Sequence, residues 1–176
     1  MADMNSPSPA PAGARTCPLR RDRLQPQFCD LIPSTLAALD PMVDKVMGVV
    51  QAACCAPEEL DGVELALREA LANAILHGNR RDPAKQVLVA CYCEEGSEGG
   101  LLLLVRDEGP GFDPAAVPDP TTAEAIYAGH GRGIFLMRQV MDRVNYQEGG
   151  CEVELRQRGK SPCSSERPAS PGAADK

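Results

Sequence analysis

The spacing of apolar residues along the chain predicts both helices and strands. Apolar positions recur every three or four residues in the segments 40–53 and 57–78, which is the period of an amphipathic helix. Shorter runs at 24–32, 86–94 and 101–105 predict strands instead. The last of these is apolar throughout, as expected of a central strand that is buried on both faces.

The ends of the two predicted helices carry residues that suit those positions. Asp40 is a good N-cap, and Pro41 fits the first helical position. The second helix is expected to end near His77 and Gly78, where glycine can adopt a left-handed cap. The inner face of the first helix is expected to hold Val43, Val46, Met47 and Val50.

The remainder predicts a long loop, a third helix and a hairpin. Residues 113–131 are polar and Pro-rich without an apolar period, whereas 134–144 has helical spacing. Residues 145–148 and 152–156 are expected to form a hairpin across Gly149-Gly150. This order predicts an α+β fold, a two-layer sandwich in which three helices cover one face of a mixed sheet.

Composition divides the chain of 176 residues into one domain and two tails. Residues 1–22 and 159–176 are rich in Pro, Ser and Ala, so neither can bury enough apolar surface to fold. They are predicted to be disordered tails around one domain at 23–158. Apolar residues make up 43% of the chain, which is enough for one core, but aromatic residues supply only 3%.

Charge and cysteine placement exclude several classes of function. The net charge of −7 argues against a nucleic-acid binder and against an anionic membrane surface. No apolar run approaches the ~20 residues that span a bilayer, and the start lacks the order of a secretory signal, so a cytoplasmic protein is expected. The eight cysteines form no Cys-x-x-Cys pair, so zinc is not expected and the thiols are expected to be reduced.

Three polar residues share one stripe of the second predicted helix. Glu69, Asn73 and His77 are spaced by four residues, so they drift by only ~40° per step around the helix. Asn73 offers a neutral oxygen ligand to Mg²⁺, and Glu69 can accept a proton from an attacking hydroxyl. On its own, the stripe is more typical of a solvated helix face.

An acidic residue follows the buried strand directly. Asp107 comes after Val105-Arg106, and Gly109 and Gly111 come next. A carboxylate at that edge can accept the exocyclic amine of adenine, and the glycines let the chain pass close to a base. Alone, the segment also fits a plain Asp-Gly turn.

A glycine-rich segment precedes the third helix. Gly129, Gly131 and Gly133 alternate with His130 and Arg132, and such a segment frees backbone N–H groups for phosphate oxygens at a positive helix end. No strand precedes it and no Gly-Lys-Ser/Thr follows, so it is neither a dinucleotide fingerprint nor a P-loop. By itself it also fits an irregular loop.

Together and in this order, the three features resemble a known family. The runs ELALREALANAILHGN, VRDEGPGFDP and GHGRGIFLMRQVMDRV are similar to the ATP-binding domain of the anti-sigma-factor serine kinases, within the histidine-kinase-like ATPase superfamily. The resemblance covers roughly residues 24–157. It implies that Glu69 is the catalytic base, that Asn73 binds Mg²⁺ and that Asp107 recognises adenine beside Gly109 and Gly111.

The resemblance also implies how the phosphates are held. Gly131 and Gly133 match the glycines where an ATP lid, here residues 113–130, meets the phosphates. Further residues are implied near the phosphates or the protein substrate: His77, Asn79, Arg81, Gly129, His130 and Arg132. The chain departs from the family at the last hairpin, where Cys151 replaces a frequent Thr. A thiol is a poorer hydrogen-bonding group, which predicts a lower nucleotide affinity.

Residue 69 separates members of the superfamily. Histidine kinases usually carry Asn at this position, because the acceptor imidazole is already nucleophilic, whereas a serine hydroxyl needs a base such as Glu69. The resemblance therefore implies a homodimeric kinase that binds ATP and Mg²⁺, holds a sigma factor inactive and phosphorylates a serine of a small antagonist. Two alternatives remain: a partner-switching module without phosphotransfer, and a detached histidine-kinase catalytic domain.

Overall fold

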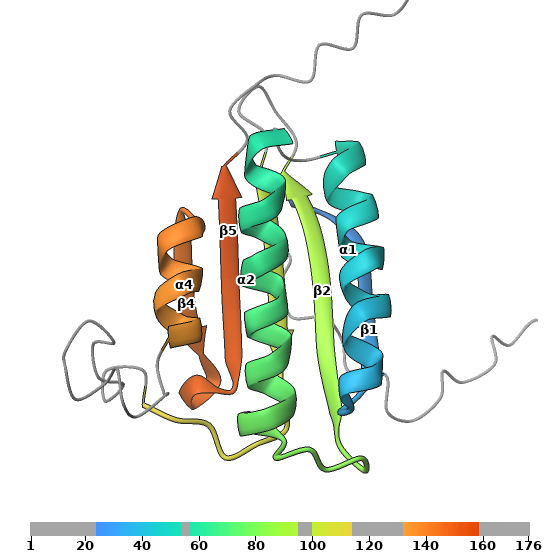
Figure 1. Cartoon of the computed structure of the whole chain (residues 1–176), viewed down its shortest axis with the longest axis vertical. Coiled ribbons are helices and arrows are strands. Elements are labelled where there is room, and N and C mark those ends of the chain that lie inside the picture. The colour runs from blue at the N-terminus through green and yellow to red at the C-terminus, as the bar shows by residue number, and fades with distance from the viewer. Residues whose placement is uncertain (1–23, 54–56, 95–99, 114–131, 159–176) are drawn as a thin grey trace, which may run out of the picture.

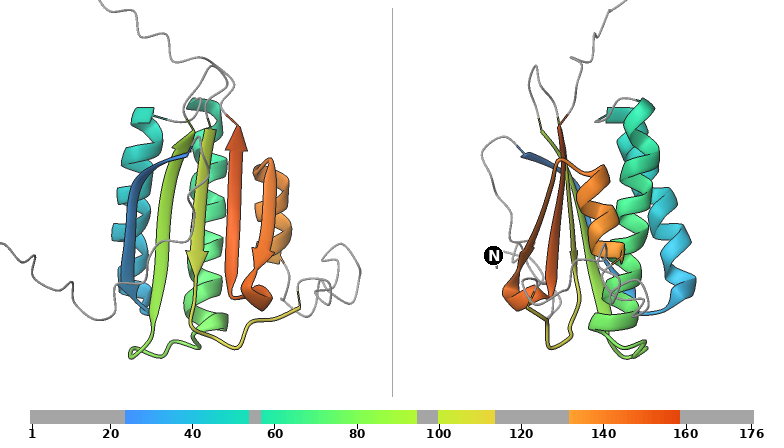
Figure 2. Two further views of the ribbon diagram at one scale, coloured as in Figure 1. Left: turned by 180° about the vertical axis from the view of Figure 1, so that it is seen from behind. Right: turned by 60° about the vertical axis from the view of Figure 1, so that its left-hand side comes forward.

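A computed structural model describes residues 24–53, 57–94, 100–113 and 132–158, in which helices cover one face of a five-stranded sheet (Figure 1). The strands are β1 Leu24–Pro33, β2 Gln86–Glu94, β3 Gly100–Arg106, β4 Arg143–Gln147 and β5 Glu152–Arg158. The helices are α1 Leu39–Ala53, α2 Leu60–Asn73 and α4 Arg132–Val140. The predicted α+β class with three helices on one face is confirmed (Figure 2).

The sheet has the order β1-β2-β3-β5-β4, and each neighbouring pair is antiparallel, so the predicted mixed sheet is wrong. Two helices, α1 and α2, connect β1 to β2 and return the chain to the edge it left, where Pro33 pairs with Gln86. α4 leads into β4, which runs in the same direction as β3 because both strands pair antiparallel with β5. However, β5 lies between these two strands, so no parallel neighbours result.

The core lies between the sheet and the helices, with α2 at its centre (Figure 2, right). The predicted inner face of α1 is buried there, at Val43, Val46, Met47 and Val50. β3 is buried on both faces, as predicted: Leu101, Leu103 and Val105 join the helical side, and Leu102 and Leu104 join a second apolar cluster on the opposite face.

The third helix and the last hairpin are confirmed with different bounds. α4 ends at Val140, not at 144, and β4 begins at Arg143. Val144 pairs with Leu155 of β5 and packs against the core from the sheet. Apolar spacing alone does not separate the end of a helix from the start of a strand that packs on the same core.

The C-terminal end of α2 continues as a π-helical turn, Ala74–Gly78. The Asn79 N–H donates to the Ala74 carbonyl at 2.8 Å, which closes this wider turn. The left-handed cap predicted at Gly78 is absent; Arg80 and Arg81 carry the positive φ values instead, 57° and 59°. Gly78 lacks a side chain for another reason, because a Cβ there would overlap the carboxyl group of Asp107.

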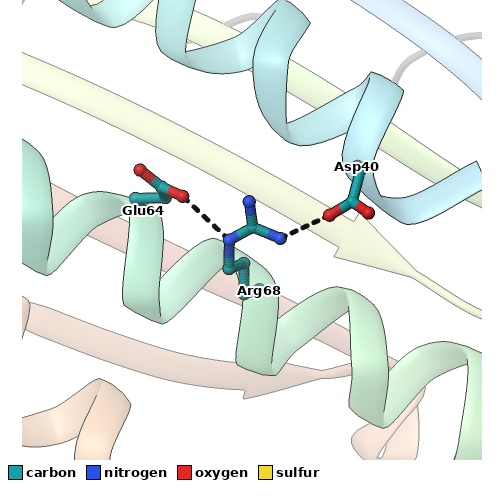
Figure 3. A network of polar contacts seen from close by, with 3 residues as sticks. All are labelled: Asp40, Glu64 and Arg68. Carbon is teal, nitrogen blue, oxygen red and sulfur yellow. Dashed lines mark hydrogen bonds and ion pairs between the residues drawn. The ribbon is translucent and has the colours of Figure 1, made fainter.

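Arg68 of α2 bridges two acidic residues, one on α1 and one on the preceding turn of α2 (Figure 3). Its Nη1 donates to Asp40 Oδ1 of α1 at 2.6 Å, and its Nε donates to Glu64 Oε1 at 2.8 Å. The predicted N-cap at Asp40 is wrong, because α1 begins one residue earlier and a 3₁₀ turn, Leu36–Ala38, precedes it. Asp40 instead links α1 to α2 through an exposed ion pair, and such a pair adds little to the stability of the fold.

Four of the cysteines lie within the described residues. Cys29, Cys91 and Cys151 carry thiols that form no disulfide, whereas Cys93 is disulfide-bonded. The expectation of reduced thiols is therefore wrong for Cys93. The predicted tails, 1–22 and 159–176, lie outside the part that the structure describes. Among the helices that it does describe, none combines the length and the apolarity needed to span a bilayer.

Candidate functional site

A cavity of about 660 Å³ opens beside the C-terminal half of α2. Its walls come from α2 and its π-helical turn, the end of β3, the start of α4 and the first residues of β5. The polar residues that line it are Glu69, Asn73, His77, Asp107, Asp113 and Arg132. This volume lies in the range of small-molecule sites, which are mainly apolar with a few placed polar groups.

Glu69 and Asn73 meet the start of α4 at one side of the cavity. A Cβ added at Gly133 would overlap Glu69 Oε2 and lie 3.5 Å from Asn73 Nδ2. Both side chains are therefore directed at the first turn of α4, as their spacing by one helical turn predicts. Any larger residue at position 133 would displace the Glu69 carboxylate from this place.

Asp107 lines the cavity beside Gly78, at the end of the π-helical turn. Its Oδ1 accepts the Gly109 N–H at 2.7 Å, and its carboxyl group packs on the backbone of Gly78. Burial raises the pKa of Asp107, and the Gly109 N–H and Lys85 only partly oppose this. The carboxylate is thus poorly solvated, which favours a ligand that donates a hydrogen bond to it.

Cys151 joins Asp107 to the start of β5. The Asp107 N–H donates to the Cys151 carbonyl at 3.0 Å, and the Cys151 thiol donates to the Gly109 carbonyl at 3.3 Å. Burial, with the nearby Asp107 and Glu148, raises the pKa of Cys151, so this thiol is held in its protonated form. A protonated thiol at this position acts as a hydrogen-bond donor and not as a nucleophile.

The rest of the cavity is apolar and aromatic, and sequence reasoning missed most of it. Val105, Ile134, Met137 and Val153 form the floor. Phe112 and Tyr146 meet edge to face, with ring centroids 5.1 Å apart, at the rim. Burial raises the pKa of Tyr146 to about 12, despite the nearby Arg138, and its hydroxyl has no hydrogen-bond partner within the described structure. Together these residues provide a slot for a flat, mostly apolar group with a polar edge.

Most of the predicted site residues converge on this cavity. Glu69, Asn73, His77, Asp107, Gly111, Arg132 and Gly133 all line it. Gly109 lies behind Asp107, where a Cβ would overlap the Gly78 carbonyl. Gly129, His130 and Gly131 lie outside the described residues, as does most of the predicted lid at 113–130. Asn79 was expected near the phosphates or the protein substrate, but its side chain is 0% exposed and bonds to backbone groups, so it does not face the cavity.

The carboxamide oxygen of Asn73 suits a hard cation that takes most of its ligands from water and substrate phosphates. Within the described ranges, no cluster of three or more His, Cys, Asp and Glu side chains could hold a metal ion by itself. Mg²⁺ commonly takes one or two protein oxygens and fills its octahedral shell with waters and substrate phosphates. The Asn73 carboxamide, beside Glu69 at the base of α4, fits that use and does not fit a metal held by protein alone.

Comparison with known proteins gives one family and several relatives. The family described as the histidine kinase-like ATPase domain matches residues 32–157. An anti-sigma F factor of Heyndrickxia coagulans is 31% identical over 132 residues, which are 71% of this chain and 78% of that protein. An anti-sigma F factor of Geobacillus thermodenitrificans is 32% identical over 116 residues, which are 64% of this chain and 67% of that protein. The serine-protein kinase RsbW of Staphylococcus epidermidis is 24% identical over 116 residues, which are 61% of this chain and 71% of that protein.

Proposed function

The chain belongs to the histidine kinase-like ATPase family, among the relatives of the anti-sigma F factors, and we propose from this that it is an ATP-dependent serine kinase that also restrains a sigma factor. The ATPase domain implies ATP binding. Transfer of phosphate to a partner serine and the choice of partners are the parts that we propose.

One observation supports the proposal above the others. A half-buried carboxylate, Asp107, and a carboxylate–carboxamide pair, Glu69 and Asn73, line the same cavity from different elements. The poorly solvated Asp107 matches the amine of adenine, and the apolar floor matches the faces of the ring. Glu69 and Asn73, beside Gly133, then lie on the side of α4, whose N-terminal end favours phosphate oxygens.

The proposed chemistry follows from the placement of these side chains. A serine of the partner enters beside Glu69, which takes the hydroxyl proton as the serine oxygen bonds to the γ-phosphorus and the bond to ADP breaks. Asn73 would hold Mg²⁺, which neutralises charge on the phosphate oxygens when it is bound. Arg132, at the start of α4, adds a positive charge to the same part of the cavity.

The partners are proposed from the names of the relatives. Anti-sigma F factors and the serine-protein kinase RsbW are named for a sigma factor and for serine phosphorylation. We propose a sigma factor and a small serine-bearing antagonist as alternative partners of this chain, with ATP controlling their exchange. The homodimer and the cytoplasmic location stay predictions.

Labelled ATP tests the proposal. The protein is used with and without ATP to capture partners from its native extract, and the captured antagonist is then incubated with the protein and γ-labelled ATP. Acid-stable label on a serine is the expected result. Acid-labile label would instead support a detached histidine-kinase domain, and ATP binding without any label would support a switch that transfers no phosphate; either result would overturn the kinase.

Replacing Cys151 by Thr is expected to tighten ATP binding about threefold to tenfold. A hydroxyl forms stronger hydrogen bonds than a thiol, and Cys151 already donates to the Gly109 carbonyl next to Asp107. Calorimetry with Mg²⁺·ATP measures the change, and Cys29→Ser, at an exposed position on β1, is the control. Unchanged or weaker binding in Cys151→Thr would contradict the expected benefit of a hydroxyl.

A further inference from the structure

Asn79 is the most completely buried polar residue near the cavity, and the proposed chemistry does not use it. Its side chain is 0% exposed, and both ends of the carboxamide are bonded. Nδ2 donates to the Gln86 carbonyl at 2.9 Å, and Oδ1 accepts the Glu108 N–H at 2.8 Å. Asn79 thus joins the end of the second helix to the start of β2 and the end of β3.

Glu108 completes the arrangement from the other side. Its Oε2 accepts the Gln86 N–H at 3.1 Å, so Gln86 is bonded through both its N–H and its carbonyl. The chain between Asn79 and Gln86 passes through the left-handed residues Arg80 and Arg81. Such backbone conformations cost roughly 1–2 kcal/mol per residue, so they persist only where surrounding contacts fix them.

The bond from Asn79 to the Glu108 N–H acts on Asp107 directly. That N–H belongs to the peptide unit that follows Asp107, and the unit before it is held by the bond from the Asp107 N–H to the Cys151 carbonyl. Both backbone dihedrals of Asp107 are therefore fixed by partners on different elements. The direction of its carboxyl group follows, because the side chain leaves the backbone at that point.

We propose that Asn79 is a positioning residue that sets the preference of this site for adenine by fixing the backbone of Asp107. The inference rests on the proposed nucleotide function and deepens it. A carboxylate selects the amine of adenine only if its oxygen lies within about 3 Å of that amine, and a small rotation of the peptide unit would lose the bond. Asn79 itself touches no nucleotide.

The test compares ATP with ITP, which carries a carbonyl oxygen where adenine has its amine. Asn79→Ala in the full chain should weaken ATP binding about tenfold and leave ITP binding within about twofold, as measured by calorimetry with Mg²⁺. A purely structural role would weaken both nucleotides alike. In an Asp107→Asn background, Asn79→Ala should have no further effect on ATP affinity, because the group through which it acts has been changed.

Two further variants keep the test decisive. Asn79→Asp retains an oxygen for the Glu108 N–H, and burial favours its protonated form, which can still donate to the Gln86 carbonyl. This variant should recover most of the ATP preference. It also replaces Asn79→Ala in the test if that variant fails to fold. Asn145→Ala, on β4, is the matched control and should change neither affinity. Equal loss for both nucleotides, an unchanged ATP-to-ITP ratio, or additivity with Asp107→Asn would overturn the role of Asn79. Failure of the wild-type protein to bind ATP would overturn the proposed function first.

Discussion

Replacing Glu69 by Gln is expected to leave ATP binding within about twofold of wild type and to slow serine phosphorylation on the order of 10²- to 10⁴-fold. The two side chains have the same shape, so the contact with the start of α4 at Gly133 is kept. The amide cannot take a proton from the attacking hydroxyl. Calorimetry gives the affinity, and transfer of label to the partner serine gives the rate.

A matched variant separates the loss of this base from the loss of a negative charge. Glu58→Gln removes an exposed carboxylate just before the same helix and should change neither quantity. Transfer by Glu69→Gln at the rate of the Glu58 control would show that another group takes the proton. A parallel loss of ATP binding would show instead that Glu69 acts in binding and not in the chemical step.

The sequence predicted the polar residues of the cavity better than its walls. Glu69 and Asn73 are one helical turn apart, so helix periodicity alone places them together. Asp107 was predictable because it directly follows a continuously apolar strand. In contrast, Phe112 lies in the loop after β3 and Tyr146 lies on β4, so they come together only through the tertiary fold, whose strand order puts β5 between β3 and β4.

That strand order was also the weakest part of the fold prediction. Local patterns gave the strands and helices, because burial on one or both faces leaves a period in the sequence. They did not state which strands are neighbours, since pairings such as Val105 with Val153 join residues far apart in the chain. Antiparallel pairing throughout follows from the return of the chain through α1 and α2 to β2 and from the position of β5 between β3 and β4.

The two residues after His77 show why side-chain roles are harder to predict than helix ends. Gly78 was predicted as a left-handed cap, and Asn79 as a residue near the phosphates. The helix ends at Gly78, close to the predicted place, but its last turn is π-helical, and this turn sets the direction of the two residues. Gly78 then faces Asp107, and Asn79 turns into the protein, which no spacing in the sequence indicates.

Replacing Gly78 by Ala is expected to weaken ATP binding on the order of tenfold to a hundredfold and to lower the free energy of unfolding by about 1–3 kcal/mol. The added Cβ would overlap the Asp107 carboxyl group, so either that side chain or the turn must move. Movement of Asp107 removes the proposed contact to adenine. Calorimetry with ATP and denaturant unfolding measure the two effects.

Two comparisons identify the steric contact as the cause. Gly48→Ala, on the exposed side of α1 with no atom near the added Cβ, should leave ATP binding unchanged and stabilise the protein by about 0.5–1 kcal/mol, because alanine favours the helix. Adding Asp107→Ala to Gly78→Ala removes the carboxyl group that the new methyl meets, so the double variant should be as stable as Asp107→Ala alone. ATP binding by Gly78→Ala equal to that of the Gly48 control would show that Asp107 can leave its observed position without loss. The adenine contact would then have to come from another group in the cavity.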